Sequence, residues 1–375
     1  MFRRHPADDP KGEGRLEGKY HRQIAYWLYA CGIMVLAMVV IGGVTRLTGS
    51  GLSIVNWEPV RRWLPPGSSA EWQAMFDLYR TSPEYQKLHA TTMTLAGFKD
   101  IFWLEYVHRL IARVTGMVFL FPFLFFLLMR RIPPLLAPRL VGVFLLGGAQ
   151  GVLGWYMVKS GLVDDPSVSQ YRLTAHLMLA FLIGAALFWM ALTLHLGARA
   201  SATSGNPGLR LFAWLTTALV ALTATSGGFV AGLKAGHAYN TFPLMEGRWI
   251  PDAYWQLEPA GRNLFDNIAA VQWNHRVLAV VTLCTVLLFR LFVRRYTLPD
   301  RLRLGLDLLM GLALVQVSLG VATLLLEVPV PLATTHQGSA FVLLMTALFV
   351  THQMHHAPPT RALSASILAS RATTA

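Results

Sequence analysis

Eight apolar stretches limit what this chain can fold into, because a helix of about 20 apolar residues crosses the roughly 30 Å of hydrocarbon in a bilayer. Of the 375 residues, 54% are hydrophobic and 14% are charged, whereas a soluble protein carries about 25% charged residues. We therefore expect an all-α integral membrane protein with eight transmembrane helices. The expected spans are residues 24–45, 105–129, 138–159, 171–196, 209–232, 268–293, 303–326 and 331–353.

The basic residues predict the orientation of the chain. Lys and Arg gather in the N-terminal tail, in the loops after the second, fourth and sixth spans, and in the C-terminal tail. Such residues mark the cytoplasmic side, so both termini are expected in the cytoplasm. Topology thus accounts for the net charge of +13, and no nucleic-acid partner is expected. The acidic residues of the N-terminal tail suit neither a signal peptide nor a transit peptide, so we expect a bacterial inner membrane.

Two long segments, 46–104 and 233–267, are then expected to face outward. In the first of them, Ser82-Pro83-Glu84 predicts the start of a short helix over residues 83–100, because Ser is a frequent N-cap and Pro a frequent first residue of a helix.

The second half of the chain repeats the first. The corresponding positions include Gly42 and Gly227, Glu105 and Gln272, His108 and His275, Gln150 and Gln316, and His176 and His336. They stand roughly 160 to 185 residues apart, a spacing typical of an internal repeat of several helices. An even number of spans gives both halves the same orientation. We predict two pseudo-symmetric four-helix bundles, 24–200 and 201–356, between cytoplasmic tails 1–23 and 357–375.

Four histidines stand near the outward ends of their spans: His108, His176, His275 and His336. A histidine within a membrane segment is a candidate functional residue, although one alone is equally often a structural hydrogen-bond partner. These four form one pair in each half. Paired imidazoles within a helix bundle are typical ligands of a heme iron, whereas zinc or copper recruits three or four ligands. The pattern predicts two heme sites, with small residues on the other four helices making room for the macrocycles.

Other polar residues carry alternatives. Arg109 and Arg276 suit heme propionates, because a guanidinium binds a carboxylate bidentately, but they equally suit a place at the membrane interface. His352, His355 and His356 are expected in a solvated tail rather than a metal site, and His237 in an outer loop.

Glu105 breaks the symmetry between the halves. It stands one helical turn before His108, with Cβ atoms roughly 5–6 Å apart. Its counterpart Gln272 cannot exchange a proton near neutral pH. A carboxylate beside an iron ligand suits proton transfer, and the alternative is a cap at the start of the helix. We expect chemistry in the half with Glu105 and a permanent cofactor in the other.

These residues together resemble the heme A synthase family over about residues 24–353. The motifs that carry the resemblance are Gly43-Val44-Thr45-Arg46-Leu47-Thr48, Phe98-Lys99-Asp100-Ile101-Phe102, Glu105-Tyr106-Val107-His108-Arg109, Tyr171-Arg172-Leu173 with His176, Tyr239-Asn240-Thr241-Phe242-Pro243, Gln272 with His275-Arg276, and His336-Gln337. The chain is similar to the proteobacterial and mitochondrial branch, because it lacks the outer-loop cysteine pair of another branch. Gly97 and Ala112 depart from the acidic residue and the glycine that are usual there.

The resemblance implies oxidation of a methyl group of heme O to the formyl group of heme A, for cytochrome oxidase, with water as the oxygen source. It implies that His108 and His176 bind heme O, that His275 and His336 hold heme b for electron transfer, and that Glu105 handles protons or stabilises positive charge at the methyl carbon. Heme O synthase, a farnesyltransferase, and cytochrome oxidase assembly factors are expected partners, together with membrane lipid.

Two rival interpretations are a non-catalytic di-heme b-type electron-transfer protein and a transporter that uses histidines for proton coupling. The first accounts for the four histidines but not for the difference between Glu105 and Gln272. The second predicts a protein without heme.

Overall fold

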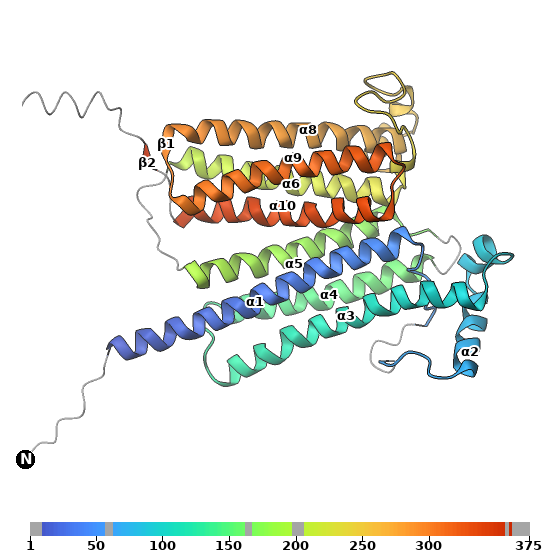
Figure 1. The fold of residues 1–375 in the computed structure, drawn as a ribbon, viewed down its shortest axis with the longest axis horizontal. Coiled ribbons are helices and arrows are strands. Elements are labelled where there is room, and N and C mark those ends of the chain that lie inside the picture. Colours follow the sequence, from blue (N-terminus) through green and yellow to red (C-terminus); the bar gives the residue numbers. More distant parts are fainter. Residues whose placement is uncertain (1–9, 57–62, 162–166, 197–205, 357–359, 362–375) are drawn as a thin grey trace, which may run out of the picture.

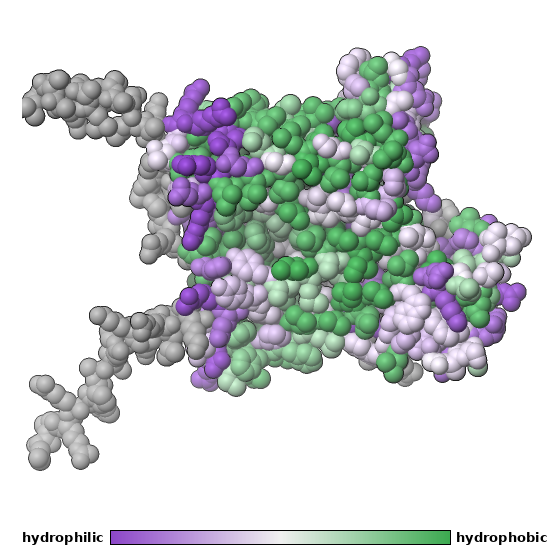
Figure 2. Space-filling view, in the orientation of Figure 1, coloured by the Kyte–Doolittle hydropathy of each residue, from purple (hydrophilic) through white to green (hydrophobic). Residues whose placement is uncertain are grey.

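The computed structural model describes residues 10–56, 63–161, 167–196, 206–356 and 360–361. Over these residues, eight helices are long and apolar enough to cross a membrane. They are α1 (Pro10–Leu47), α3 (Leu95–Leu128), α4 (Ala137–Gly161), α5 (Gln170–Leu196), α6 (Pro207–Gly232), α8 (Ile268–Phe292), α9 (Asp300–Leu325) and α10 (Val330–His356). Apolar side chains cover the middle of the surface, and polar ones gather at both ends (Figure 2). The protein is an integral membrane protein, as its composition predicted.

Shorter elements fill the connections. They are α2 (Ser69–Arg80), the π-helical turn η1 (Tyr85–His89), the 3-10 turns η2 (Ala235–His237), η3 (Asp252–Trp255), η4 (Ala260–Arg262) and η5 (Val293–Arg295), and the short α7 (Asn263–Asp266). Two strands of two residues, β1 (Tyr296–Thr297) and β2 (Thr360–Arg361), pair antiparallel. This strand pair was not predicted, and it joins the segment after α10 to the loop between α8 and α9.

The helices contact one another in two groups (Figure 1). Helix α1 packs against α3 and α5, and α4 packs against both α3 and α5. In the same way α6 packs against α8 and α10, and α9 packs against both α8 and α10. The groups meet where α5 and α1 contact α10 and where α5 contacts α6.

The two long connections lie at one end of the helices, which we call the loop end, and the start of α1 and the end of α10 lie at the other (Figure 1). Near the loop end, α2 packs its aromatic face on the first turns of α3. The buried residues of this cluster are Trp72, Met75, Phe76, Tyr79, Phe98, Phe102 and Tyr106.

The structure differs from the sequence prediction at the start of α3. The predicted helix over 83–100 is not formed as one unit, because a turn separates η1 from α3 and the side chain of Thr94 caps α3 by accepting from the backbone of Gly97. Helix α3 therefore begins at Leu95, ten residues before the predicted span. Glu105 lies in the interior of this helix, so its interpretation as a helix cap is wrong.

Candidate heme sites

The predicted histidines come together in two pairs. His108 on α3 lies close enough to His176 on α5 for their charges to interact. His275 on α8 and His336 on α10 have ring centres 6.5 Å apart and ring planes at 85°. Two imidazoles on one metal ion have ring centres about 6 Å apart, because each metal–nitrogen bond is about 2 Å long. The spacing of the second pair therefore fits one iron ion between the rings.

Each of the four imidazoles packs against a glycine of a neighbouring helix. A Cβ atom added at Gly42, Gly154, Gly227 or Gly320 would lie 3.3, 3.0, 3.1 or 2.9 Å from the nearest ring atom of His108, His176, His275 or His336, respectively. Any side chain at these positions would crowd the imidazole. The sequence predicted small residues that make room for a macrocycle, and in this structure the glycines make room for its ligands.

The hydrogen bonds of the ring nitrogens are compatible with metal ligation. Nδ1 of His275 lies 2.8 Å from the hydroxyl of Ser226, which leaves Nε2 as the ligand atom. A hydrogen bond of this kind fixes the ring orientation of a metal-binding histidine. Nδ1 of His176 and Nδ1 of His336 are buried and have no hydrogen-bond partner among the described residues.

Gln150 also belongs to the first pair, a role that the sequence reasoning missed. Its Nε2 lies 3.3 Å from Nε2 of His176 and donates to the carbonyl of His176 at 3.1 Å. Its counterpart Gln316 also donates to the carbonyl of its histidine, and its Oε1 accepts from Ser339. Leu179 stands three residues after His176, where Ser339 follows His336. Oε1 of Gln150 is consequently buried without a partner in the described part of the chain, so the two pairs differ in polarity.

Glu105 holds the first outer segment against α3. Its Oε2 accepts from the hydroxyl of Ser53 at 2.7 Å and from the backbone N–H of Ile54 at 2.9 Å. Its Oε1 accepts from Nε and Nη2 of Arg109 at 3.0 and 2.5 Å. Arg109 also donates to the carbonyl of Ile54 at 3.0 Å. The carboxylate is 2% exposed, and charge-assisted hydrogen bonds of this kind are strong.

Gln272 makes the corresponding contacts, but its contact with the outer segment has the opposite polarity. Its Oε1 accepts from Arg276 at 3.1 Å, as Oε1 of Glu105 accepts from Arg109. Its Nε2 donates to the carbonyls of Ala235 and Ala238 at 2.8 and 2.5 Å. The first outer segment thus offers donors to a carboxylate, and the second offers acceptors to an amide. The first half has Glu105 where the second half has Gln272, and each side chain suits the hydrogen-bonding groups of the outer segment that it faces.

Both arginines are engaged by the protein. Beyond Gln272, Arg276 donates to the carbonyls of Tyr239 and Thr241 at 2.7 and 2.8 Å. Its Nε is buried and finds no partner among the residues that the structure describes. If Arg276 contacts a heme propionate, as the sequence predicted, the N–H group still available for that contact is the one on Nε.

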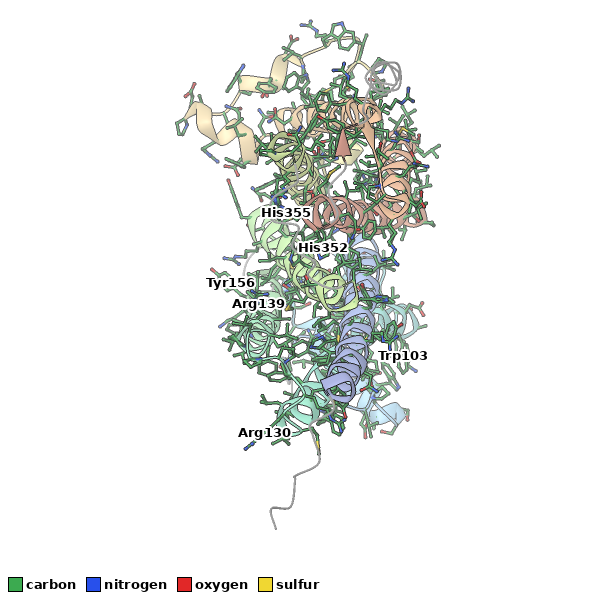
Figure 3. The ribbon with its side chains drawn as sticks, turned by 90° about the vertical axis from the view of Figure 1, so that its left-hand side faces the viewer. Trp103, Arg130, Arg139, Tyr156, His352 and His355 are labelled. Carbon is green, nitrogen blue, oxygen red and sulfur yellow. The ribbon has the colours of Figure 1, made fainter. Side chains whose placement is uncertain are left out.

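The histidines at the opposite end are not in a solvated tail. His352 is fully buried, with its ring 5.0 Å from that of Trp189 and its Nε2 3.2 Å from the hydroxyl of Thr193. Nε2 of His355 accepts from the indole N–H of Trp214 at 2.8 Å. Figure 3 labels both residues where the two groups of helices meet. The prediction of a solvated tail is wrong because α10 continues to His356 and packs this turn between α5 and α6. His237 is exposed in η2.

Fold and site together describe a helical membrane protein with two pairs of inward-facing histidines. In the described part of the chain, only the pair of His108 and His176 has a neighbouring carboxylate, that of Glu105. Comparison with known proteins is consistent with this class. The chain belongs to the COX15-CtaA family, described as cytochrome oxidase assembly protein, which matches residues 25–348.

Relatives that carry the name heme A synthase are similar over nearly the whole chain. The protein from Nitrosospira multiformis is 51% identical over 89% of this chain and 94% of its own length. That from Paramagnetospirillum magneticum is 48% identical over 92% and 97%. The bovine heme A synthase COX15 is 42% identical over 90% and 83%.

Proposed function

We propose that this protein is a heme A synthase, an oxidoreductase that converts a methyl group of heme O to the formyl group of heme A. The relatives named heme A synthase support the reaction. Conversion of the methyl group with water as the oxygen source releases four electrons and four protons. The electrons need an acceptor outside the site, and the protons need a base near the reacting carbon.

The difference between the two histidine pairs carries the assignment of roles. His108 and His176 bind the substrate heme O, and His275 and His336 hold heme b as the permanent cofactor. When bound, heme b would supply a one-electron carrier that accepts electrons from the substrate. The spacing of the His275 and His336 rings supports this ligand pair. So does the hydrogen bond between Nδ1 of His275 and Ser226, whose own hydroxyl donates to the carbonyl of Thr223.

Glu105 is the catalytic carboxylate of this proposal. It lies one turn from His108 on α3, where it accepts protons or stabilises positive charge that develops at the methyl carbon. Its ion pair with Arg109 and its bonds to Ser53 and Ile54 hold it in place. Gln272, in the equivalent place, is an amide and serves only to hold its loop.

The remaining assignments concern the arrangement of the whole chain. The two groups of contacting helices support two pseudo-symmetric halves, 24–200 and 201–356, with tails 1–23 and 357–375. Both termini are cytoplasmic, and both heme sites face the periplasm from the bacterial inner membrane, as the distribution of Lys and Arg indicates. Heme O synthase is the partner that delivers the substrate, because free heme is poorly soluble.

The variant Glu105→Gln tests the function. We expect purified protein that still carries heme b, together with cells that accumulate heme O and lose heme A, measured by extraction and mass analysis of the pigments. Normal heme A would contradict the catalytic role of Glu105 and favour a non-catalytic di-heme electron-transfer protein. The wild-type extract provides the second check, since absence of heme O and heme A would contradict the reaction itself.

A further inference from the structure

A cavity of about 350 Å³ opens beside the contact between α1 and α3. It is lined by Ile41, Val44, Asp100, Trp103, Leu104 and Val107. The four residues from α3 follow the spacing of one helical stripe, and all but Asp100 are apolar. Trp103 is 42% exposed and Val107 is 37% exposed. Figure 3 labels Trp103 on the outside of the bundle.

The cavity borders the binding place of the first histidine pair. Leu104 lies one helical turn before His108 on α3, so their side chains are neighbours on the same face of the helix. Ile41 directly precedes Gly42, where an added Cβ atom would meet the imidazole of His108. An apolar group held in the cavity is therefore adjacent to whatever His108 binds.

The equivalent stripe in the other half is closed. It consists of Asn267, the N-cap residue of α8, and of Ala270, Val271 and Asn274 on that helix. Ala270 and Val271 are 0% and 2% exposed. The side chain of Asn267 donates to the carbonyls of Ala253 and Tyr254, and the hydroxyl of Tyr254 donates to Asn274. The segment around η3 thus covers the whole stripe.

This difference follows the chemistry of the two hemes. Heme O carries a long farnesyl-derived chain on its macrocycle, and heme b has only a vinyl group in that place. Among the residues that the structure describes, the half assigned to heme b is closed where the half assigned to heme O is open, and the lining of the open side is apolar apart from Asp100.

We propose that the cavity between α1 and α3 binds the farnesyl-derived chain of heme O, an inference that rests on the proposed function. With the iron on His108, a seated chain prevents rotation of the macrocycle about the iron–histidine axis. It thereby decides which methyl group faces Glu105, the residue that follows Leu104. Restriction of a substrate to one orientation in this way accelerates its reaction.

The test compares two hemes that differ in the chain. Heme O or heme b is added to the purified protein with its resident heme b, and binding that depends on His108 is followed by visible absorption. The farnesyl-derived chain moves from lipid or detergent into an apolar cavity, so its gain in binding free energy comes from packing alone. We therefore expect heme O to bind roughly tenfold more tightly than heme b. The variants Ile41→Trp and Leu104→Trp fill the cavity from either helix. We expect each to reduce heme O affinity to that of heme b and to leave heme b affinity unchanged.

A matched control is Leu145→Trp, which adds the same side chain at an exposed apolar position of α4 and should change neither affinity. Retention of the resident heme b reports correct folding of each variant. Equal affinity of the wild type for the two hemes would overturn the inference. So would variants that weaken both hemes in parallel or neither, the latter being the result expected if a lipid chain occupies the cavity. Heme A formation by the wild type is measured separately, so failure of the proposed function is distinguishable.

Discussion

At the scale of single residues, the contact between each histidine and its glycine leads to a direct prediction. Gly320→Ala places a methyl group 2.9 Å from the ring of His336, and overpacking of this kind costs about 1–3 kcal/mol. We expect it to reduce the heme b content of the purified protein. Gly311→Ala, on the same helix with no atom within 4 Å of the added Cβ, is the control and should retain full heme b content. Equal heme content in both variants would show that the close contact is unimportant.

A comparison of two glycine variants in the first half should show whether the His108–His176 pair binds the substrate heme O rather than the cofactor heme b. Gly154→Ala crowds His176, whereas Gly148→Ala on the same helix meets nothing within 4 Å. We expect Gly154→Ala to raise the KM for heme O several-fold while the resident heme b stays at the wild-type level. Titration with heme O and the absorption spectrum provide the two measurements. Loss of heme b from the Gly154→Ala variant would contradict the assignment of one heme to each pair.

Glu105 could serve to hold the outer segment or to take part in the reaction, and variants of its hydrogen-bond partners distinguish these two roles. Ser53→Ala removes one hydrogen bond to Glu105 and keeps its charge, so heme A formation should fall by about tenfold and persist, in line with about 1.5 kcal/mol for one hydrogen bond to a charged group. Gln272→Glu would set a carboxylate against the carbonyls of Ala235 and Ala238 and should lower thermal stability. If Ser53→Ala abolished heme A as Glu105→Gln is expected to, holding the loop would be the main role of Glu105.

The sequence predicted the roles of some of these polar residues but not their contacts. The histidines and Glu105 stand out because a polar side chain in an apolar helix is rare, and the repeat pairs them. The hydrogen-bond partners around each histidine depend on which side chains of neighbouring helices meet, and the spacing of residues along the sequence does not encode this. Gln150 illustrates this limit, because its unpaired oxygen results from Leu179, a residue on another helix.

At the scale of elements, the cluster formed by α2 and the start of α3 holds a buried acid outside the membrane. Glu84 is 5% exposed and accepts from the hydroxyl of Tyr79 at 3.2 Å. Burial, and to a lesser extent the charge of Glu105, raise the pKa of Glu84 from 4.5 to about 7, although the bond from Tyr79 lowers it. In the unfolded segment this pKa returns to its ordinary value.

This raised pKa predicts that the segment is less stable at higher pH. Between pH 4.5 and about 7 the folded state holds a proton that the unfolded state has released, so the free energy of unfolding falls as the pH rises through this window. We expect faster hydrogen exchange in residues 69–89 at pH 8 than at pH 5.5, after correction for the intrinsic rate. Glu84→Gln should remove the difference, and an unchanged pH profile in that variant would contradict the assignment to Glu84.

The boundaries of elements were predicted well where apolar runs end and poorly where polar and aromatic residues alternate. Six of the eight helices begin within three residues of their predicted starts, whereas α1 begins 14 residues and α3 ten residues before the predicted span. Helix α3 began at Leu95 because the cluster around Phe98 and Phe102 is buried by α2. Burial by another element outside the membrane leaves no continuous apolar run in the sequence.

At the scale of the whole molecule, the two groups of helices contact each other through small residues. A Cβ atom at Gly184 of α5 would lie 2.4 Å from the ring of Phe341 on α10 and 3.6 Å from Val35 on α1. Close approach through small residues is the usual way in which helices associate in a membrane. Hydrogen bonds cross the same junction, from Arg46 to the carbonyl of Ala231 at 3.0 Å and from Gln337 to the carbonyl of Val39 at 2.7 Å.

Because α5 carries His176 and α10 carries His336, a change at their contact should affect both histidine pairs. Gly184→Leu must displace Phe341 or separate the two helices, so we expect a lower temperature of heme b loss together with reduced heme A formation. Gly142→Leu on α4, where an added Cβ meets no atom within 4 Å, adds the same volume away from the junction and should leave both properties unchanged. If Gly184→Leu reduced heme A formation while the thermal release of heme b stayed normal, the halves would respond independently. The contact between α5 and α10 would then serve assembly only, without coupling the two sites.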